Sequence, residues 1–178
     1  QVKNVGATSR WYAGSGINRH VWLKELEPVH VAQWGTFIST PEVSASSARI
    51  NIKTNVQNEK NASSSITLIN RIIDANGNEV ARTTSKQIIN ANNDYEFNDE
   101  ATVQSPALWS TENPNLYKAI TEVYVDGKLS DDIETKFGIR KISFNAINGF
   151  ALNGNCMKLK GGCFHIDNGL LGARAFGR

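Results

Sequence analysis

The sequence contains little cysteine, no long apolar run and no concentrated block of charge. Its 178 residues include two cysteines, Cys156 and Cys163, together with four prolines and one methionine. On one extended strand these cysteines would lie roughly 23 Å apart at about 3.3 Å per residue, whereas a disulfide needs Cα atoms within about 7 Å. We therefore expect two free thiols, which say nothing about the cellular compartment.

The charge balance and the apolar content exclude two classes of partner. Lysine and arginine number 19 against 17 aspartates and glutamates, and no basic block is longer than two residues. This thin positive charge argues against a nucleic-acid partner. Apolar runs of only a few residues argue against a membrane span, and the start at Gln1 lacks the pattern of a signal peptide. Because 40% of the residues are hydrophobic, the chain can bury a core.

Between Val29 and Phe137 apolar residues recur at alternate positions, which is the period of a half-buried β-strand. Asn76–Gly77 and Asp126–Gly127 are hairpin signals, and no window shows a helical apolar stripe. The pattern predicts an all-β fold, an immunoglobulin-like antiparallel β-sandwich of about seven strands that lacks the cysteine pair of antibody domains. Strands are expected at residues 29–38 (before a turn at Pro41), 48–56, 65–74, 79–83, 95–103 and 116–125, and in a run ending at Phe137.

The C-terminal part of the sequence predicts an extension beyond the sandwich. A strand over 137–144 is followed by a hairpin with Asn153–Gly154 at its turn and by a further strand leading to His165 and Asp167. Before it, the link from Pro106 to Leu116 would cross between the sheets with Trp109 as its anchor. Tyr117, which follows this link, is expected to hydrogen-bond back to it.

The N-terminal part is rich in aromatic residues. Gly14 and Gly16 bracket a tight turn, and residues 19–25 alternate as a strand. Trp11 and Trp22 would either stack on sugars or pack against a neighbouring domain, and we favour packing because tryptophan flanked by a strand pattern is usually buried.

Four stretches resemble glycoside hydrolase family 2, the family of β-galactosidases, β-glucuronidases and β-mannosidases. Within this family the sequence looks most similar to bacterial β-galactosidases. They are Ser9–Leu23, Leu108–Tyr117, Phe137–Lys141 and Leu152–Asp167, and they follow the order and spacing of the family. The resemblance implies three parts: 1–27 as the tail of a jelly-roll sugar-binding-type domain, 28–140 as the sandwich, and 141–178 as an interdomain hairpin and the first strand of a (β/α)₈ barrel.

The resemblance also implies that the catalytic residues lie elsewhere. Retaining glycosidases need two carboxyl groups about 5–5.5 Å apart, and in this family both are glutamates on later barrel strands. We interpret the remaining acidic candidates as solvent-exposed residues of polar turns. They are the pairs Asp99–Glu100 and Asp131–Asp132, and Glu112–Asn113, in which the order of the family's Asn-Glu pair is reversed. We therefore expect both catalytic glutamates beyond Arg178 and a chain that is inactive alone, a non-catalytic spacer of a retaining β-glycosidase.

His165 and Asp167 are the candidate substrate-binding residues, in the parent enzyme only. The family pattern resembles Gly-Val-Asn-x-His-His-Asp, from which Cys163 and Ile166 depart. The first histidine of the pattern lies at the mouth of the first barrel strand, where barrel enzymes bind substrate. No cofactor is expected, and no metal, because Cys163, His165 and Asp167 on one strand cannot surround an ion.

Two other interpretations remain open for the chain itself. It could be a free-standing carbohydrate-binding module that uses Trp11, Trp22, Trp34 or Trp109 as stacking rings, or an immunoglobulin-like interaction module. Apolar residues on both terminal segments also predict self-association or folding back onto the sandwich. The compartment stays undecided between bacterial periplasm and cytoplasm.

Overall fold

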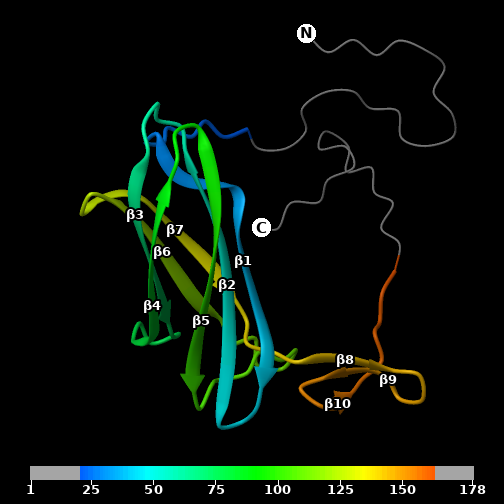
Figure 1. Cartoon of the computed structure of the whole chain (residues 1–178). Coiled ribbons are helices and arrows are strands. Elements are labelled where there is room, and N and C mark those ends of the chain that lie inside the picture. Colours follow the sequence, from blue (N-terminus) through cyan, green and yellow to red (C-terminus); the bar gives the residue numbers. More distant parts are fainter. Residues whose placement is uncertain (1–20, 163–178) are drawn as a thin grey trace, which may run out of the picture. The chain divides into compact units, whose positions relative to one another are not determined.

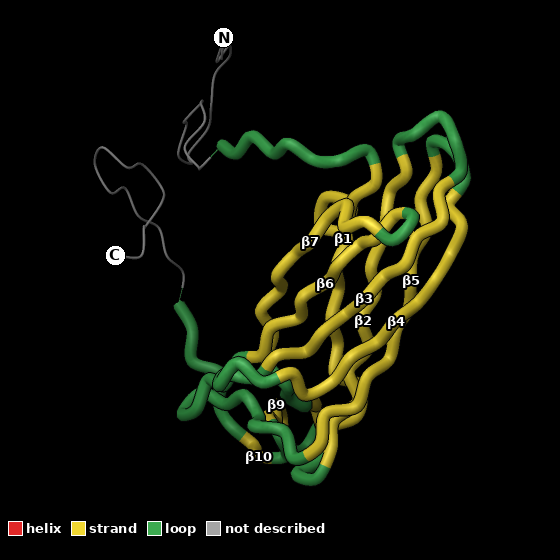
Figure 2. Tube along the Cα trace, turned by 90° about the vertical axis from the view of Figure 1, so that its left-hand side faces the viewer, coloured by secondary structure: helices red, strands yellow, loops and turns green. Residues whose placement is uncertain are grey.

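The computed structural model of the protein describes residues 21–162, in which all regular structure is β-strand (Figures 1 and 2). The chain divides into two compact units, of which Leu26–Lys158 contains every strand of the described residues. These strands are β1 (Val29–Val43), β2 (Ser47–Asn58), β3 (Ser64–Ile73), β4 (Glu79–Ile89), β5 (Asn93–Gln104), β6 (Tyr117–Val125), β7 (Lys128–Phe137), β8 (Ile142–Asn145), β9 (Gly149–Leu152) and β10 (Asn155–Cys156).

The first seven strands form two antiparallel sheets. A three-stranded sheet has the order β1-β2-β5, and a four-stranded sheet has the order β4-β3-β6-β7. The two sheets pack face to face (Figure 1). Strands β8, β9 and β10 form a small third sheet after the sandwich. The predicted all-β sandwich with a C-terminal hairpin is confirmed.

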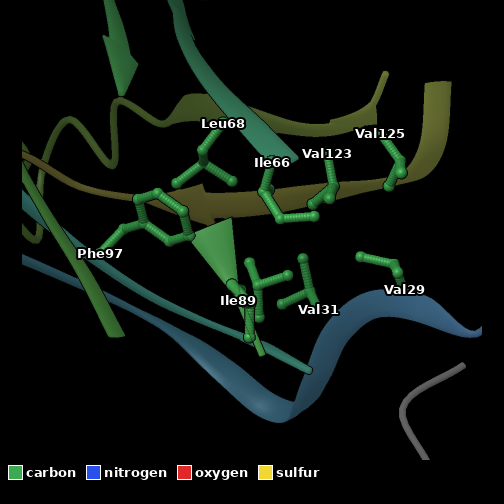
Figure 3. Close-up of a cluster of buried hydrophobic side chains, with 9 residues drawn as sticks. Val29, Val31, Ile66, Leu68, Ile89, Phe97, Val123 and Val125 are labelled. Atoms are coloured by element: carbon green, nitrogen blue, oxygen red, sulfur yellow. The ribbon is translucent and has the colours of Figure 1, made fainter. Parts of the chain in front are cut away.

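The core lies between the sheets because every second side chain of each strand points inward. Figure 3 shows Val123 of the four-stranded sheet pointing toward Val31 of the other. Two groups of buried side chains result. The first apolar cluster is Val29, Val31, Val56, Ile66, Leu68, Ile89, Phe97, Val123 and Val125. The second apolar cluster is Ala48, Ile50, Ile52, Ile72, Ala101, Val103, Tyr117, Ala119 and Ile139.

The outer face of the three-stranded sheet is polar along β2 and β5. Side chains of β2 contact those of β5 diagonally: Lys53 pairs with Glu96 at 3.1 Å, and the Asn51 amide donates to Asn98 at 2.8 Å. Arg49 lies 3.6 Å from Glu100 in the same diagonal sense. This face is therefore a ladder of polar pairs in contact with solvent.

Strand β1 departs from the expectation at two points. It runs past Pro41 to Val43, so the predicted turn at Pro41 is wrong; an irregularity between Ser39 and Glu42 accommodates the proline, which has no N–H for the ladder. A larger bulge places residues 32–35 opposite Asn55. There Trp34 has a φ of 60° and is 91% exposed.

The strands expected outside the sandwich are shorter than predicted. Residues 21–27 carry no strand, so no strand runs through Glu25, and β10 ends at Cys156 without continuing over 157–162. The hairpin turns are as predicted. Asp126 and Gly127 both have positive φ values of 50° and 79°, as a two-residue hairpin turn that matches the strand twist requires.

The edge of β1 is covered by side chains of β7. The Val31 N–H donates to Asp131 Oδ2 at 2.9 Å, and the Ser130 hydroxyl donates to the Val29 carbonyl oxygen at 2.6 Å. Edge strands left with free backbone groups pair with other chains. Asp131 and Ser130 therefore close this side of the sandwich.

Glu79 should make stability depend on pH. Hydrogen bonds from Arg82 and then from Arg71 lower the pKa of the Glu79 carboxyl from 4.5 to about 2. Because the folded-state pKa lies below the unfolded value, this contribution is complete above about pH 4.5 and is lost as the pH falls toward 2. In urea titrations, wild type should be more stable than Glu79→Gln at pH 7, with a difference that shrinks toward pH 2. A difference that stayed constant over this range would contradict the assignment.

Candidate functional site at the Trp109 junction

The candidate site lies where the chain leaves the sandwich for the β8–β10 hairpin. The segment after β7, residues 138–141, runs beside the link between β5 and β6. The Trp109 N–H of this link donates to the Ile139 carbonyl oxygen at 2.8 Å. Ile139 itself is fully buried in the second apolar cluster. Trp109 thus anchors the exit segment, as the sequence predicts for the link.

The indole of Trp109 is half-buried and packs against residues of the exit segment. A Cβ added to Gly138 would lie 2.8 Å from both Cβ and Cγ of Trp109, so only glycine fits at this position. The Arg140 guanidinium lies 4.8 Å from the centre of the indole ring, within the range of a cation–π interaction. These contacts give Trp109 a structural role at the exit segment.

Asn153 of the hairpin turn joins the hairpin to this anchor. With Gly154 it forms the turn between β9 and β10, at φ values of 51° and 84°. Its Oδ1 accepts from the Lys141 N–H at 2.9 Å, and its Nδ2 donates to the Trp109 carbonyl oxygen at 3.0 Å. One side chain thus bonds the exit segment and the link together. We call Trp109, Gly138, Arg140 and Asn153 the Trp109 junction.

Strand β1, the link itself and the start of β6 support the junction. The Thr40 hydroxyl of β1 donates to the Arg140 carbonyl oxygen at 2.7 Å. The Asn115 amide donates to the Leu108 carbonyl oxygen at 2.9 Å. The Tyr117 hydroxyl accepts from the Ala107 N–H at 2.9 Å, as its place after the link predicts.

Removing the Tyr117 hydroxyl should loosen the link. Tyr117→Phe leaves the ring buried but takes away the acceptor of the Ala107 N–H, and the free energy of unfolding should fall by about 1 kcal/mol. Chemical denaturation measures this loss. Tyr124→Phe is the matched control, because the Tyr124 hydroxyl makes only a long contact of 3.3 Å to Glu122. Equal effects of the two substitutions would argue against the role of Tyr117.

The cavity beside the junction does not offer glycosidase chemistry. It has a volume of about 530 Å³ and is lined by Ile38, Ser39, Thr40, Trp109, Leu116, Lys136, Phe137, Gly138, Arg140 and Ile142. This lining has two cationic side chains and no carboxyl group. Cleavage of a glycosidic bond by a retaining enzyme needs two carboxyl groups.

Four of the acidic residues singled out in the sequence have structural partners, one of them Glu100, which lies near Arg49. The interpretation of Asp99 and Asp131 as turn residues is wrong: Asp99 is buried in β5 and accepts from Asn70 at 2.8 Å, and Asp131 in β7 bonds the Val31 N–H. Glu112 does lie in an exposed loop, where the Thr111 hydroxyl donates to it at 2.7 Å and lowers the pKa of its carboxyl.

The predicted substrate-binding residues, His165 and Asp167, lie outside the described residues, as does Cys163. Cys156 is a free, exposed thiol. Over residues 21–162 no three His, Cys, Asp or Glu side chains are grouped so that they could hold a metal ion. In the same range no helix has the length and apolar character needed to cross a membrane.

Sequence reasoning misses the roles of Gly138, Arg140 and Asn153. Asn153 is recognisable as a turn residue, but its bonds to residues 109 and 141 depend on contacts that are distant along the chain. The contact between Gly138 and Trp109 has one signal in the sequence: both residues lie in stretches that resemble the same family.

The sandwich and its exit segment are those of a known family of glycoside hydrolases. The sequence model of glycosyl hydrolases family 2 matches residues 29–140. The chain belongs to glycosyl hydrolases family 2, and the resemblance noted from its motifs is confirmed.

Individual relatives extend the similarity to nearly the whole chain. A β-galactosidase from Bacteroides ovatus is 40% identical over 165 residues, which cover 93% of this chain and 19% of that protein. A β-glucuronidase from Formosa agariphila is 32% identical, over 82% of this chain and 16% of that protein. A solved structure of a family 2 member from Bacteroides cellulosilyticus has a TM-score of 0.90 and 43% identity, over 98% of this chain and 24% of that one. The chain therefore spans about a fifth of the length of these relatives.

Proposed function

We propose that the chain is the non-catalytic sandwich segment of a longer β-glycosidase that acts on carbohydrate O-glycosidic bonds. The observation that carries this proposal is the family match over 29–140 in a chain that spans about a fifth of its β-galactosidase and β-glucuronidase relatives. In this role the Trp109 junction holds the β8–β10 hairpin against the sandwich, so that the polypeptide after the hairpin starts from a fixed position.

The flanking parts are proposed to belong to neighbouring domains. Residues 1–27 would be the tail of a jelly-roll domain, and residues 141–178 would be the interdomain hairpin and the first strand of a (β/α)₈ barrel. The order of β8, β9 and β10 directly after the exit segment supports the second assignment. His165 and Asp167 would then contact the sugar in the parent enzyme. His165→Ala in the full-length polypeptide should raise KM. An unchanged KM would mean that His165 does not contribute to substrate binding.

Turnover and binding assays on the 178-residue chain test the main proposal. We expect no hydrolysis of p-nitrophenyl β-galactoside or β-glucuronide, because the cavity beside the junction has no carboxyl group in its lining. We also expect no binding of galactose or glucuronate at millimolar concentration, as befits a spacer segment. Turnover that survives purification to homogeneity would overturn the non-catalytic assignment.

A carbohydrate-binding module is the second candidate, and Trp34 is the observation that favours it. Its indole is 91% exposed on a bulge whose tight packing leaves no space for a Cβ at Gly35, 2.7 Å from the Ala32 carbonyl oxygen. A bulky residue at positive φ is uncommon and often marks a functional site. A galactoside titration followed by tryptophan fluorescence, with Trp34→Ala as the comparison, decides: saturable quenching that the variant loses supports the module.

Self-association of the isolated chain is a further expected result. Phe144 on β8 is 75% exposed and Ile147, in the turn between β8 and β9, is 91% exposed; exposed apolar residues at short strands favour pairing with another copy. Sedimentation velocity should show a concentration-dependent dimer that Phe144→Ser weakens. A monomer at all concentrations up to about 0.5 mM would contradict this expectation.

A further inference from the structure

The inner faces of the sandwich carry a group of polar side chains in the middle of the core. Its members are Asn70 on β3, Thr83 and Ser85 on β4, Asp99 on β5 and Thr121 on β6, and we call it the polar belt. Asn70 and Thr121 are 0% exposed and Asp99 is 7% exposed. Buried polar groups destabilise a fold unless they are hydrogen-bonded, so their arrangement needs an explanation.

The belt is a connected hydrogen-bond network. Within the four-stranded sheet, Asn70 pairs directly with Thr83 on one side and Thr121 on the other. The Thr121 hydroxyl donates to Asn70 Oδ1 at 2.7 Å, and Asn70 Nδ2 donates to Asp99 Oδ2 at 2.8 Å. The hydroxyls of Thr83 and Ser85 also donate to the two Asp99 oxygens.

All three bonds to Asp99 cross from one sheet to the other. Asp99 belongs to the three-stranded sheet, and its donors lie on β3 and β4 of the four-stranded sheet. Hydrogen bonds to an ionised acceptor are stronger than neutral ones and demand good geometry. The bonds therefore depend on the relative position of the two sheets. The backbone hydrogen bonds within each sheet do not fix this position.

The belt also separates the two apolar clusters. On β3, the inner-facing neighbours of Asn70 are Leu68 of the first cluster and Ile72 of the second; on β5, those of Asp99 are Phe97 and Ala101. Above and below the belt, the core is thus built of side chains that differ little in chemistry. Apolar cores of this kind tolerate exchange and lose uniqueness before they lose stability.

We propose that the polar belt sets the stacking position of the two sheets. A shift by one inner-facing position moves a strand by two residues, about 6.7 Å. Asp99 would then face Leu68 or Ile72 in place of Asn70, and its buried carboxylate would lose its donors, which is strongly unfavourable. The apolar clusters bring the sheets together, and the belt selects one of their stacked arrangements. This inference does not depend on the proposed function.

An apolar version of the belt tests the proposal. The variant carries Asn70→Leu, Thr83→Val, Ser85→Ala, Asp99→Leu and Thr121→Val, and is followed by amide NMR on the whole chain. We expect a β-rich protein in which inner-facing residues of β3 and β5 show multiple or broadened resonances. A single sharp set with wild-type contacts between the sheets would overturn the proposal.

A milder substitution keeps the test decisive if the apolar variant does not fold. Asp99→Ala removes both acceptor oxygens, so the Asn70 amide and the hydroxyls of Thr83 and Ser85 all lose their common partner. Amide hydrogen exchange in β3 and β5 should become at least tenfold faster, which corresponds to about 1.4 kcal/mol. Unchanged exchange would overturn the proposal. Asn98→Ala is the matched control, because Asn98 is the outward-facing neighbour of Asp99 and bonds the exposed Asn51; it should leave exchange in β3 unchanged.

Discussion

Gly138→Val should lower the free energy of unfolding by about 3 kcal/mol and release the β8–β10 hairpin from the sandwich. The new Cβ would lie 2.8 Å from two atoms of Trp109, a distance that side-chain carbons do not adopt. Trp109 cannot easily yield, because its N–H and its carbonyl oxygen are both hydrogen-bonded, to Ile139 and to Asn153. Overpacking of this kind typically costs about 1–3 kcal/mol, and a β-branched side chain belongs at the upper end.

Two measurements separate this effect from general destabilisation. Urea denaturation gives the loss of stability, and hydrogen exchange of the Lys141 and Asn153 amides reports the bonds between the exit segment and the hairpin. Gly161→Val is the matched control, since a Cβ at Gly161 meets nothing within 4 Å. If Gly138→Val and Gly161→Val had the same stability, the close packing of Gly138 on Trp109 would be refuted.

Asn58→Asp should be equally damaging at the other end of the sandwich. Asn58 is 1% exposed, and its Nδ2 donates to the carbonyl oxygens of Ala62, Ile89 and Asn90 at 2.9–3.0 Å. Aspartate has the same shape but no donor, and it would place a buried carboxylate against three carbonyl oxygens. We expect a loss of about 3 kcal/mol or more, because the three carbonyl groups lose their donor and the buried charge faces them with the Lys60 N–H as a partner on its other oxygen.

The outcome is read from denaturation midpoints and from exchange in the two loops that Asn58 connects, residues 59–63 and 90–92. Asn51→Asp on the same strand is the control: Asn51 faces outward and bonds Asn98 in an exposed ladder. Its effect should stay within about 0.5 kcal/mol. Comparable losses at the two positions would mean that Asn58 does not hold the loops.

Local pattern is sufficient to predict the strands and turns of the sandwich. Ile50, Ile52 and Val56 alternate with polar residues in β2, and the structure buries these three as that period predicts. Asn153–Gly154 and Asp126–Gly127 form turns because these residue types accept positive φ at little cost. The role of Tyr117 can be predicted from its position after a long link.

The contacts between distant segments cannot be predicted in this way. The sequence favours a turn at Asp99 because a carboxylate is usually solvated, and only the stacking of β5 on β3 and β4 supplies donors that make its burial tolerable. Asn153 bonds Trp109, 44 residues earlier in the chain, and alternation carries no information on such a pair. Tertiary packing decides both.

The polar ladder on the outer face of the three-stranded sheet has a consequence for the chain before it folds. Isoleucine and valine in β2 are never adjacent: Asn51 separates Ile50 from Ile52, and Lys53, Thr54 and Asn55 separate Ile52 from Val56. Fibril-forming segments combine high β-propensity with low charge, and interspersed charged residues oppose their growth. We therefore expect the residues that pair with β5 in the native sheet also to lower the tendency of β2 to aggregate while the chain is unfolded.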